Sequence, residues 1–131
     1  MKLSLHDTLS RTKKEFIPID PNNVRVYACG PTVYDFAHVG NARMAVATDL
    51  LIRVLKKKFD KVTFVSNVTD VDDKIIKSAK EKNISIDALT NKFLEIYNQN
   101  MNFLNVNKPD LQPKATECIQ EMINMIQKLL D

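Results

Sequence analysis

The apolar residues of this chain follow two different spacings. Residues 24–28, Val-Arg-Val-Tyr-Ala, alternate in character after a turn-forming Asp-Pro-Asn-Asn run, which predicts a short strand. Residues 61–66 predict a second strand of the same kind. Between the strands, residues 41–58 predict a helix with Asn41 as its N-cap, because apolar residues recur at helical spacing at Met44, Ala47, Leu51, Val54 and Leu55. A strand–helix–strand unit of this length favours parallel pairing of the two strands with a right-handed crossover.

The second half of the chain is predicted to be helical. Hydroxyl and carboxylate groups gather at residues 69–73, where they favour the start of a helix that runs to about Lys82. Another helix is expected to begin after Ser85, and prolines then interrupt the pattern. The last amphipathic helix is predicted over residues 114–130.

These elements do not complete an α/β sheet. Even if residues 2–5 add a third parallel strand, the sheet is too small to close a doubly wound core, and no capping glycine follows the last helix. We therefore expect the sequence to be the beginning of a longer protein. An unfinished sheet leaves an edge and an apolar face open, which predicts that the fragment self-associates.

Composition narrows the class of protein. The 131 residues are 44% hydrophobic and 27% charged, as in an ordinary globular domain. There is no apolar run near the ~18 residues of a membrane span, and the first ten residues resemble no signal peptide. Two cysteines are too few for a secreted disulfide framework, so a cytoplasmic protein outside the membrane is predicted. The net charge of +3 permits a polyanionic partner without requiring one.

The basic run at residues 56–58 ends the predicted helix. Cations stabilise the C-terminal end of a helix dipole, so we interpret this run as a solvated helix end. A nucleic-acid contact is the alternative.

Glycine is rare in this chain, and its placement is informative. Gly30 and Gly40 are the only two glycines, where average usage gives about nine. Both lie in the loop from the first strand to the helix, where open α/β sheets bind ligands. Helix N-termini attract anions, His38 can face such a ligand, and Gly40 leaves the backbone accessible. The alternative is a plain turn glycine beside an exposed loop histidine.

Three motifs in a fixed order carry a family resemblance. His38-Val39-Gly40-Asn41 resembles the HIGH signature of class I aminoacyl-tRNA synthetases in its HIGN form. Residues 27–35, YACGPTVYD, are similar to a CGPTVYD stretch of cysteinyl-tRNA synthetases, and residues 67–75 resemble that family's NITDIDDKI. Residues 113–116, PKAT, stand where the family has PRAT. The resemblance spans nearly the whole chain.

The resemblance implies a fold and a reaction. The fold would be α/β, the first half of a Rossmann-like (HUP-type) class I synthetase catalytic domain, with parallel strands followed by several helices. Residues 1–83 would form the N-terminal half of the nucleotide-binding domain, and 84–131 a helical continuation toward the connective insertion. The family activates L-cysteine with magnesium-bound ATP to cysteinyl-adenylate and transfers it to tRNA(Cys). Its KMSKS loop and later zinc ligands have no counterpart here, so an N-terminal fragment of a monomeric enzyme, inactive alone, is expected.

The resemblance also implies roles for single residues. His38 and Asn41 would be catalytic, since they would stabilise charge on the phosphate oxygens. Together with Gly40 they would bind ATP, and Gly40 would clear space for the adenine.

Other matched residues would hold the amino acid. Gly30, Thr32 and Thr69 would bind cysteine, and Gly30 would relieve crowding between backbone and amino acid. Cys29 would be one protein ligand of a zinc ion (Zn²⁺) that takes the substrate sulfur, since thiolate is a favoured zinc ligand and a hydroxyl is a poor one. From local physics alone, Cys29 is instead a small buried residue at a strand end.

The remaining polar residues have structural interpretations. The carboxylates of Asp70, Asp72 and Asp73 could suggest a metal cluster, but no calcium-loop glycine or closing glutamate accompanies them. We interpret all three as helix-capping groups. Cys118 is assigned to the core on the apolar face of the last helix, and Tyr34 to packing.

Two alternative functions remain open. The cysteine ligase of mycothiol biosynthesis resembles these synthetases and shares adenylation and zinc, but it transfers cysteine to an amino sugar. The Lys-, Asn- and Ile-rich composition, typical of an AT-rich genome, favours the synthetase. A non-catalytic nucleotide-binding remnant is the second alternative, and the intact residues 38–41 and Cys29 argue against it.

Overall fold

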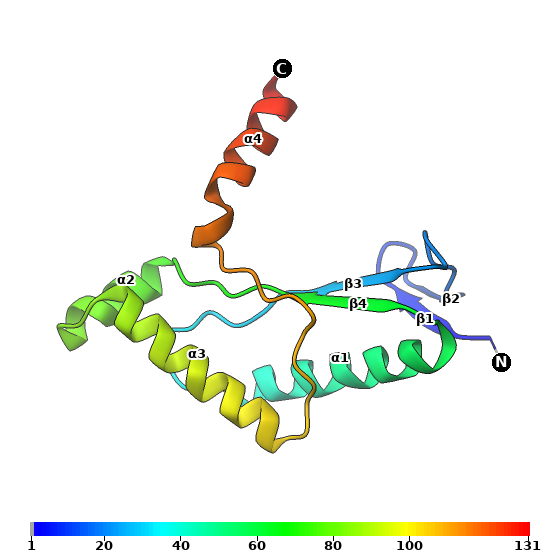
Figure 1. Ribbon diagram of the computed structural model, residues 1–131, viewed down its shortest axis with the longest axis horizontal. Helices are drawn as coiled ribbons and strands as arrows, with labels where there is room; N and C mark the ends of the chain where they lie inside the picture. Colours follow the sequence, from blue (N-terminus) through cyan, green and yellow to red (C-terminus); the bar gives the residue numbers. More distant parts are fainter. Residues whose placement is uncertain (1) are drawn as a thin grey trace.

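The computed structural model describes residues 2–131, which form an α/β fold (Figure 1). Its elements follow the predicted order, with an additional hairpin at the N-terminal end. They are β1 (Ser4–Asp7), β2 (Thr12–Glu15), β3 (Val24–Ala28), α1 (Val39–Lys58), β4 (Val62–Ser66), α2 (Asp73–Lys82), α3 (Ile86–Phe103), a 3-10 turn (Thr116–Cys118) and α4 (Ile119–Leu130).

The predicted strand–helix–strand unit is confirmed. Strands β3 and β4 pair in parallel from Val24–Val62 to Ala28–Ser66, and α1 connects them. The basic run at residues 56–58 lies in the last turn of α1, as predicted. The structure also has a row that the sequence did not predict. Residues 110–115, which we call the 110–115 row, run parallel to β4 and form isolated parallel bridges to Val65 and Val68. This segment therefore extends the hydrogen bonding of the β3–β4 pair on the β4 side.

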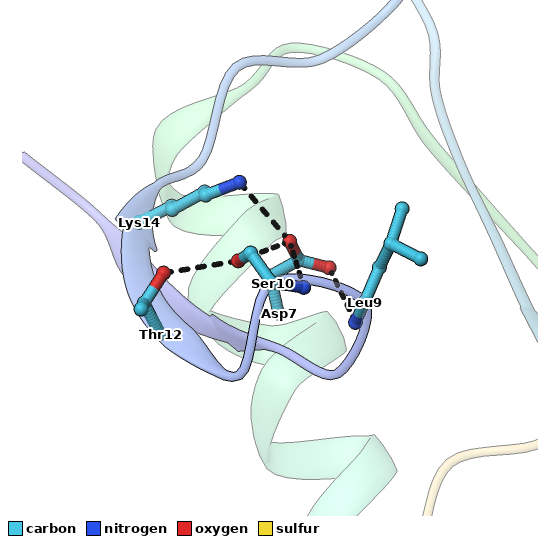
Figure 2. Close-up of polar contacts among 5 residues, drawn as sticks. All are labelled: Asp7, Leu9, Ser10, Thr12 and Lys14. Carbon is cyan, nitrogen blue, oxygen red and sulfur yellow. Dashed lines mark hydrogen bonds and ion pairs between the residues drawn. The ribbon is translucent and has the colours of Figure 1, made fainter.

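The prediction that residues 2–5 join the parallel sheet is wrong. Strand β1 pairs antiparallel with β2 in a separate hairpin. Figure 2 shows its turn, where the Asp7 carboxylate accepts hydrogen bonds from the backbone N–H of Leu9 and of Ser10, and from the Ser10 hydroxyl at 2.6 Å. The Ser10 hydroxyl and the Lys14 ammonium hold the pKa of Asp7 below its usual value. Local turn chemistry therefore pairs this segment with its nearest neighbour in sequence.

Two apolar clusters hold the fold together. The first joins α1 to the strand pair through Val24, Ile52, Leu55 and Val62. The second lies under the loops that follow β3 and β4, where it joins them to α2 and α3. Because this second cluster includes the loop residues Val33 and Val68, it fixes the position of the candidate site. Its other members are Ile75, Ala79, Leu89 and Phe93.

Helix α4 projects away from the rest of the chain (Figure 1). No residue of α4 is buried among those that the structure describes, and Leu129 is 80% exposed. The assignment of Cys118 to the core is therefore wrong: its thiol is half-buried at the N-cap of α4. The amphipathic pattern predicts a helix over residues 114–130, but α4 begins only at Ile119, after the 3-10 turn. Its apolar face has no partner within residues 2–131.

A buried carboxylate ties α1 to the loop after α3. Asp49 accepts hydrogen bonds from Arg53 Nε at 2.6 Å and from the backbone and side chain of Asn107 at 3.1 and 2.9 Å. Arg53 also donates to the carbonyl of Asn105 at 2.7 Å. Burial on its own raises the pKa of Asp49, but the bonds from Arg53 and Asn107 lower it by more, so the net pKa is below its ordinary value.

Replacing Asp49 by asparagine should therefore weaken the fold and change its acid response. A carboxyl group with a lowered folded-state pKa contributes stability above its unfolded pKa and loses it as the pH falls through the folded value. Asp49→Asn is expected to cost about 1–3 kcal/mol of unfolding free energy near neutral pH and to flatten the decline of stability between about pH 5 and about pH 2. Urea unfolding across this range measures both effects. Asp60→Asn, at an exposed site before β4, is the control. If the unfolding free energy of Asp49→Asn fell with decreasing pH as steeply as that of the unmodified chain, the prediction would be contradicted.

Candidate functional site

The loops after β3 and β4 lie side by side at the carboxyl edge of the strand pair. Thr32 and Thr69 form a parallel bridge, in which Val33 N donates to the Thr69 carbonyl at 3.3 Å and Thr69 N donates to the Pro31 carbonyl at 3.0 Å. The predicted cysteine-binding residues, Gly30, Thr32 and Thr69, are thereby brought to one corner of the sheet. This is the edge at which open α/β sheets bind ligands.

Asn67 organises this corner, a role that the sequence did not reveal. Its side-chain oxygen accepts hydrogen bonds from Gly30 N and from the Tyr27 hydroxyl, both at 2.9 Å. Its amide nitrogen lies 3.4 Å from the Thr69 hydroxyl. A Cβ added at Gly30 would lie 1.6 Å from the Asn67 carbonyl oxygen. The protein's own backbone therefore requires glycine here, whether or not an amino acid is bound.

His38, and not Asn41, is the N-cap of α1, so the prediction of Asn41 as N-cap is wrong. His38 Nδ1 accepts a hydrogen bond from Gly40 N at 3.1 Å, and the Asn41 side-chain oxygen accepts one from His38 N at 3.0 Å. His38 and Asn41 together form the capping box of α1. The imidazole of His38 takes the place of the hydroxyl or carboxylate that usually accepts at an N-cap, and Asn41 is its partner in the first turn. With Nδ1 accepting, the proton of the neutral ring resides on Nε2, which is left to donate to a ligand.

Gly40 differs from Gly30 in what surrounds it. A Cβ added at Gly40 would meet only His38 Nδ1, at an ordinary contact distance of 3.4 Å. Neither glycine has a positive φ; the described residues that do are Arg11, Asn83 and Asn105. The fold therefore does not require glycine at position 40, and the space beside this backbone is open.

A groove of about 300 Å³ runs along the loop between β3 and α1. It contains four of the predicted site residues: Gly30, Thr32, His38 and Asn41. Cys29, Gly40 and Thr69 lie outside its lining. Burial raises the pKa of Tyr97, and Tyr34 packs against the second apolar cluster, as predicted. The groove is also lined by Asp35, Phe36, Asp72, Lys74 and Phe93.

Cys29 is an exposed free thiol at the end of β3, so its alternative interpretation as a small buried residue is wrong. A thiolate is chemically suited to bind zinc. Within residues 2–131, however, no group of three or more His, Cys, Asp or Glu side chains could hold a metal ion. Cys29 fits a zinc site as a single ligand, and further ligands would have to come from elsewhere.

The three neighbouring carboxylates have different roles. Asp72 caps α2 by accepting a hydrogen bond from Lys74 N at 2.8 Å, so the capping interpretation is confirmed for this residue. Asp73 is the first residue of α2, where its negative charge suits the helix dipole. For Asp70 the capping interpretation is wrong. Asp70 is buried and accepts hydrogen bonds from Thr116 N at 3.0 Å and the Thr116 hydroxyl at 2.6 Å. It therefore joins the loop after β4 to the segment that leads into α4.

Comparison with known proteins gives a consistent family assignment. The chain is 51% identical over 129 residues to cysteine–tRNA ligase of Pelagibacter ubique (strain HTCC1062). The aligned region covers 97% of this chain and 28% of that relative. It is 48% identical over 130 residues to cysteine–tRNA ligase of Parvibaculum lavamentivorans, at 99% and 28% coverage. It is also 48% identical over 131 residues to that of Rhodospirillum centenum, at 100% and 29% coverage. The chain thus spans less than a third of the length of these relatives.

No helix in the described part of the chain is both long enough and apolar enough to cross a membrane. Residues 15–131 match the family model described as the tRNA synthetases class I (C) catalytic domain. This match includes β3, α1, β4 and every residue of the corner described above. The chain therefore belongs to the family of class I (C) tRNA synthetase catalytic domains.

Proposed function

We propose that this chain forms the first part of a cysteine–tRNA ligase, which activates L-cysteine with ATP and transfers it to tRNA(Cys). The observation that carries the proposal is identity near 50% over almost the whole chain to proteins of that name. The arrangement of His38 at the start of α1 supports it. Nothing specific favours transfer to an amino sugar or a non-catalytic role.

The start of α1 suits the activation step. In that step a carboxylate oxygen of cysteine forms a bond to the α-phosphorus of ATP, and the bond to the pyrophosphate oxygen breaks. Negative charge develops on the phosphate oxygens. The Nε2–H of His38 and the amide of Asn41 would donate to them, next to the partial positive charge of the helix N-terminus. Gly40 would allow the adenine to approach the backbone, because no side chain occupies that space.

The corner formed by the loops after β3 and β4 would hold the amino acid. Gly30, Thr32 and Thr69 offer backbone and hydroxyl groups to cysteine, and Asn67 fixes two of them. Cys29 would be one ligand of zinc, and a bound zinc would supply a soft cation for the substrate thiolate. Because no group of three or more His, Cys, Asp or Glu side chains within residues 2–131 could hold a metal ion, we expect this chain alone to bind zinc weakly. We also expect it to show no cysteine-dependent ATP–pyrophosphate exchange. A cytoplasmic location and a monomeric longer enzyme belong to the same proposal.

Replacing His38 by alanine tests the nucleotide site. Titration of this chain with a non-hydrolysable cysteinyl-adenylate analogue, followed by calorimetry, should show binding that His38→Ala weakens by about tenfold or more, since a lost hydrogen bond to a charged group costs about 1.5–3 kcal/mol. The control is His6→Ala, because His6 is the other histidine of the chain and lies exposed on β1. Equal affinities for the two variants, or no binding by the unmodified chain, would contradict the proposal.

A further inference from the structure

A small cavity lies between the strand pair and the helices α1 and α3, apart from the site proposed above. Its lining comes from β3, β4, α1, α3 and the segment after α3, which Figure 1 shows returning from the end of α3 to the strands. The volume of the cavity is about 50 Å³. It has one lining residue, Tyr97, in common with the groove beside His38, so the two are distinct spaces.

Much of the wall of this cavity is apolar. Each contributing element supplies an apolar residue to it: Ala28 from β3, Ala45 from α1, Phe64 from β4, Met101 from α3 and Val106 from the segment after α3. An engineered apolar cavity of about 150 Å³ takes a benzene ring. A space about one third as large therefore suits an alkyl group of about two or three carbon atoms.

The polar part of the wall is positively charged. Among the residues that the structure describes, Lys108 is the one charged residue that lines the cavity, and it forms no ion pair within residues 2–131. Asn98, Asn102 and Gln112 also line the cavity, and their side-chain amides form no hydrogen bond within the same residues. An ammonium and several amide N–H groups are therefore left to donate to a ligand.

These polar residues also mark the mouth of the cavity. Asn98, Asn102 and Lys108 line an adjoining open groove of about 530 Å³ along α3, so the cavity and that groove meet at these side chains. Glu95 is the one carboxylate in the described lining of the groove, and it accepts a hydrogen bond from the Gln99 amide at 3.2 Å. A ligand can therefore place its polar end at the mouth and its alkyl end inside.

We propose that this cavity binds a short-chain aliphatic carboxylate. Its alkyl group lies among Ala28, Ala45 and Met101, and its carboxylate lies at the mouth beside Lys108. A carboxylate only accepts hydrogen bonds, so it suits an ammonium and amide N–H groups that have no acceptor of their own. An alkylammonium would bring like charges together, and a neutral amide would lack the charge-assisted bond. The inference does not rest on the proposed function, because the cavity contains none of the residues assigned to ATP or cysteine.

The test is NMR titration of this chain with butyrate, with butyramide, which has nearly the same shape without the charge, and with butylammonium. Butyrate should shift the methyl signals of Met101 and Val106 and bind about tenfold more tightly than butyramide, as a hydrogen bond between charged groups predicts. Butylammonium should bind more weakly than either. Lys108→Gln should remove the preference for butyrate over butyramide, whereas Lys80→Gln, at an exposed position of α2, should keep it.

Filling the cavity gives a second measurement. Ala45→Leu adds apolar volume to the wall and should abolish butyrate binding, whereas Ala47→Leu, at an exposed position of the same helix, should leave it unchanged. If Ala45→Leu does not fold, the methyl shifts and the Lys108 variant still decide the question. Equal affinities for the three probes, an absence of methyl shifts in the unmodified chain, or normal butyrate binding by folded Ala45→Leu would each overturn the inference.

Competition with the adenylate analogue separates this inference from the proposed function. If the analogue displaced butyrate, butyrate would be a ligand of the nucleotide site and the inference would be overturned. Analogue binding without butyrate binding overturns this inference alone. Butyrate binding without analogue binding overturns the proposed function alone.

Discussion

Replacing Gly30 by alanine should destabilise the chain by on the order of 3 kcal/mol, the upper part of the range for overpacked sites. The added Cβ would lie 1.6 Å from the Asn67 carbonyl oxygen and 2.8 Å from its carbonyl carbon. Both atoms belong to the backbone, so rotation of a side chain cannot relieve the contact. The loops after β3 and β4 would have to separate, and the hydrogen bond from Gly30 N to Asn67 would be lost with them.

The chain provides its own control in its second glycine. At Gly40 a Cβ meets a single atom at 3.4 Å, and the residue lies in the first turn of α1, where alanine is a better helix former by roughly 0.5–1 kcal/mol. Gly40→Ala should therefore leave stability unchanged or slightly raised, while it weakens binding of the adenylate analogue under the proposed function. Urea unfolding of both variants measures the contrast. A Gly30→Ala variant as stable as Gly40→Ala would show that the two loops do not approach closely in solution.

The sequence was sufficient where structure depends on neighbouring residues. Strands β3 and β4 and helices α1, α2 and α3 follow from apolar periodicity and capping groups, and all are found within two residues of the predicted starts. The pairing partners of β1 and of residues 110–115 were not predictable in the same way. A short strand carries little information about its partner, and the prolines of the 109–113 region obscured a row that pairs with β4 on one side.

The candidate site shows the same division. The motif at residues 38–41 predicts a ligand-binding site at the start of α1, and the structure places two of its residues, His38 and Asn41, in one groove with Gly30 and Thr32. The internal geometry of the corner was not predictable, because it depends on contacts across the chain. Asn67 holds Gly30 from 37 positions away, and His38 replaces Asn41 as the cap. The groove around Phe36 likewise depends on Phe93, which a separate helix supplies.

The second large effect is expected at Asp70. Replacing it by alanine should cost about 2–3 kcal/mol, because it removes two hydrogen bonds to a buried carboxylate and leaves the backbone N–H and hydroxyl of Thr116 without that acceptor. Those bonds, at 3.0 and 2.6 Å, hold Thr116 to the loop after β4. Backbone bonds between Val68 and residues 113 and 115 run beside them, so the loss should loosen the whole row along β4.

The three carboxylates of this segment should then separate into a graded series, although they are adjacent in sequence. Asp72→Ala removes an N-cap and should cost about 1 kcal/mol, and Asp73→Ala removes a charge in the first turn of α2 and should cost at most about 0.5–1 kcal/mol. Urea unfolding gives the order, and hydrogen exchange gives the location: the amides of Ala115 and Thr116 should exchange faster in Asp70→Ala and at normal rates in Asp72→Ala. If the three variants lost equal amounts of unfolding free energy, Asp70 would contribute no more than a capping group. Contacts other than its bonds to Thr116 would then have to hold the loop after β4 to the segment before α4. The expected series places that connection in one buried carboxylate, because it is the only one of the three that reaches across the chain to a residue 46 positions away.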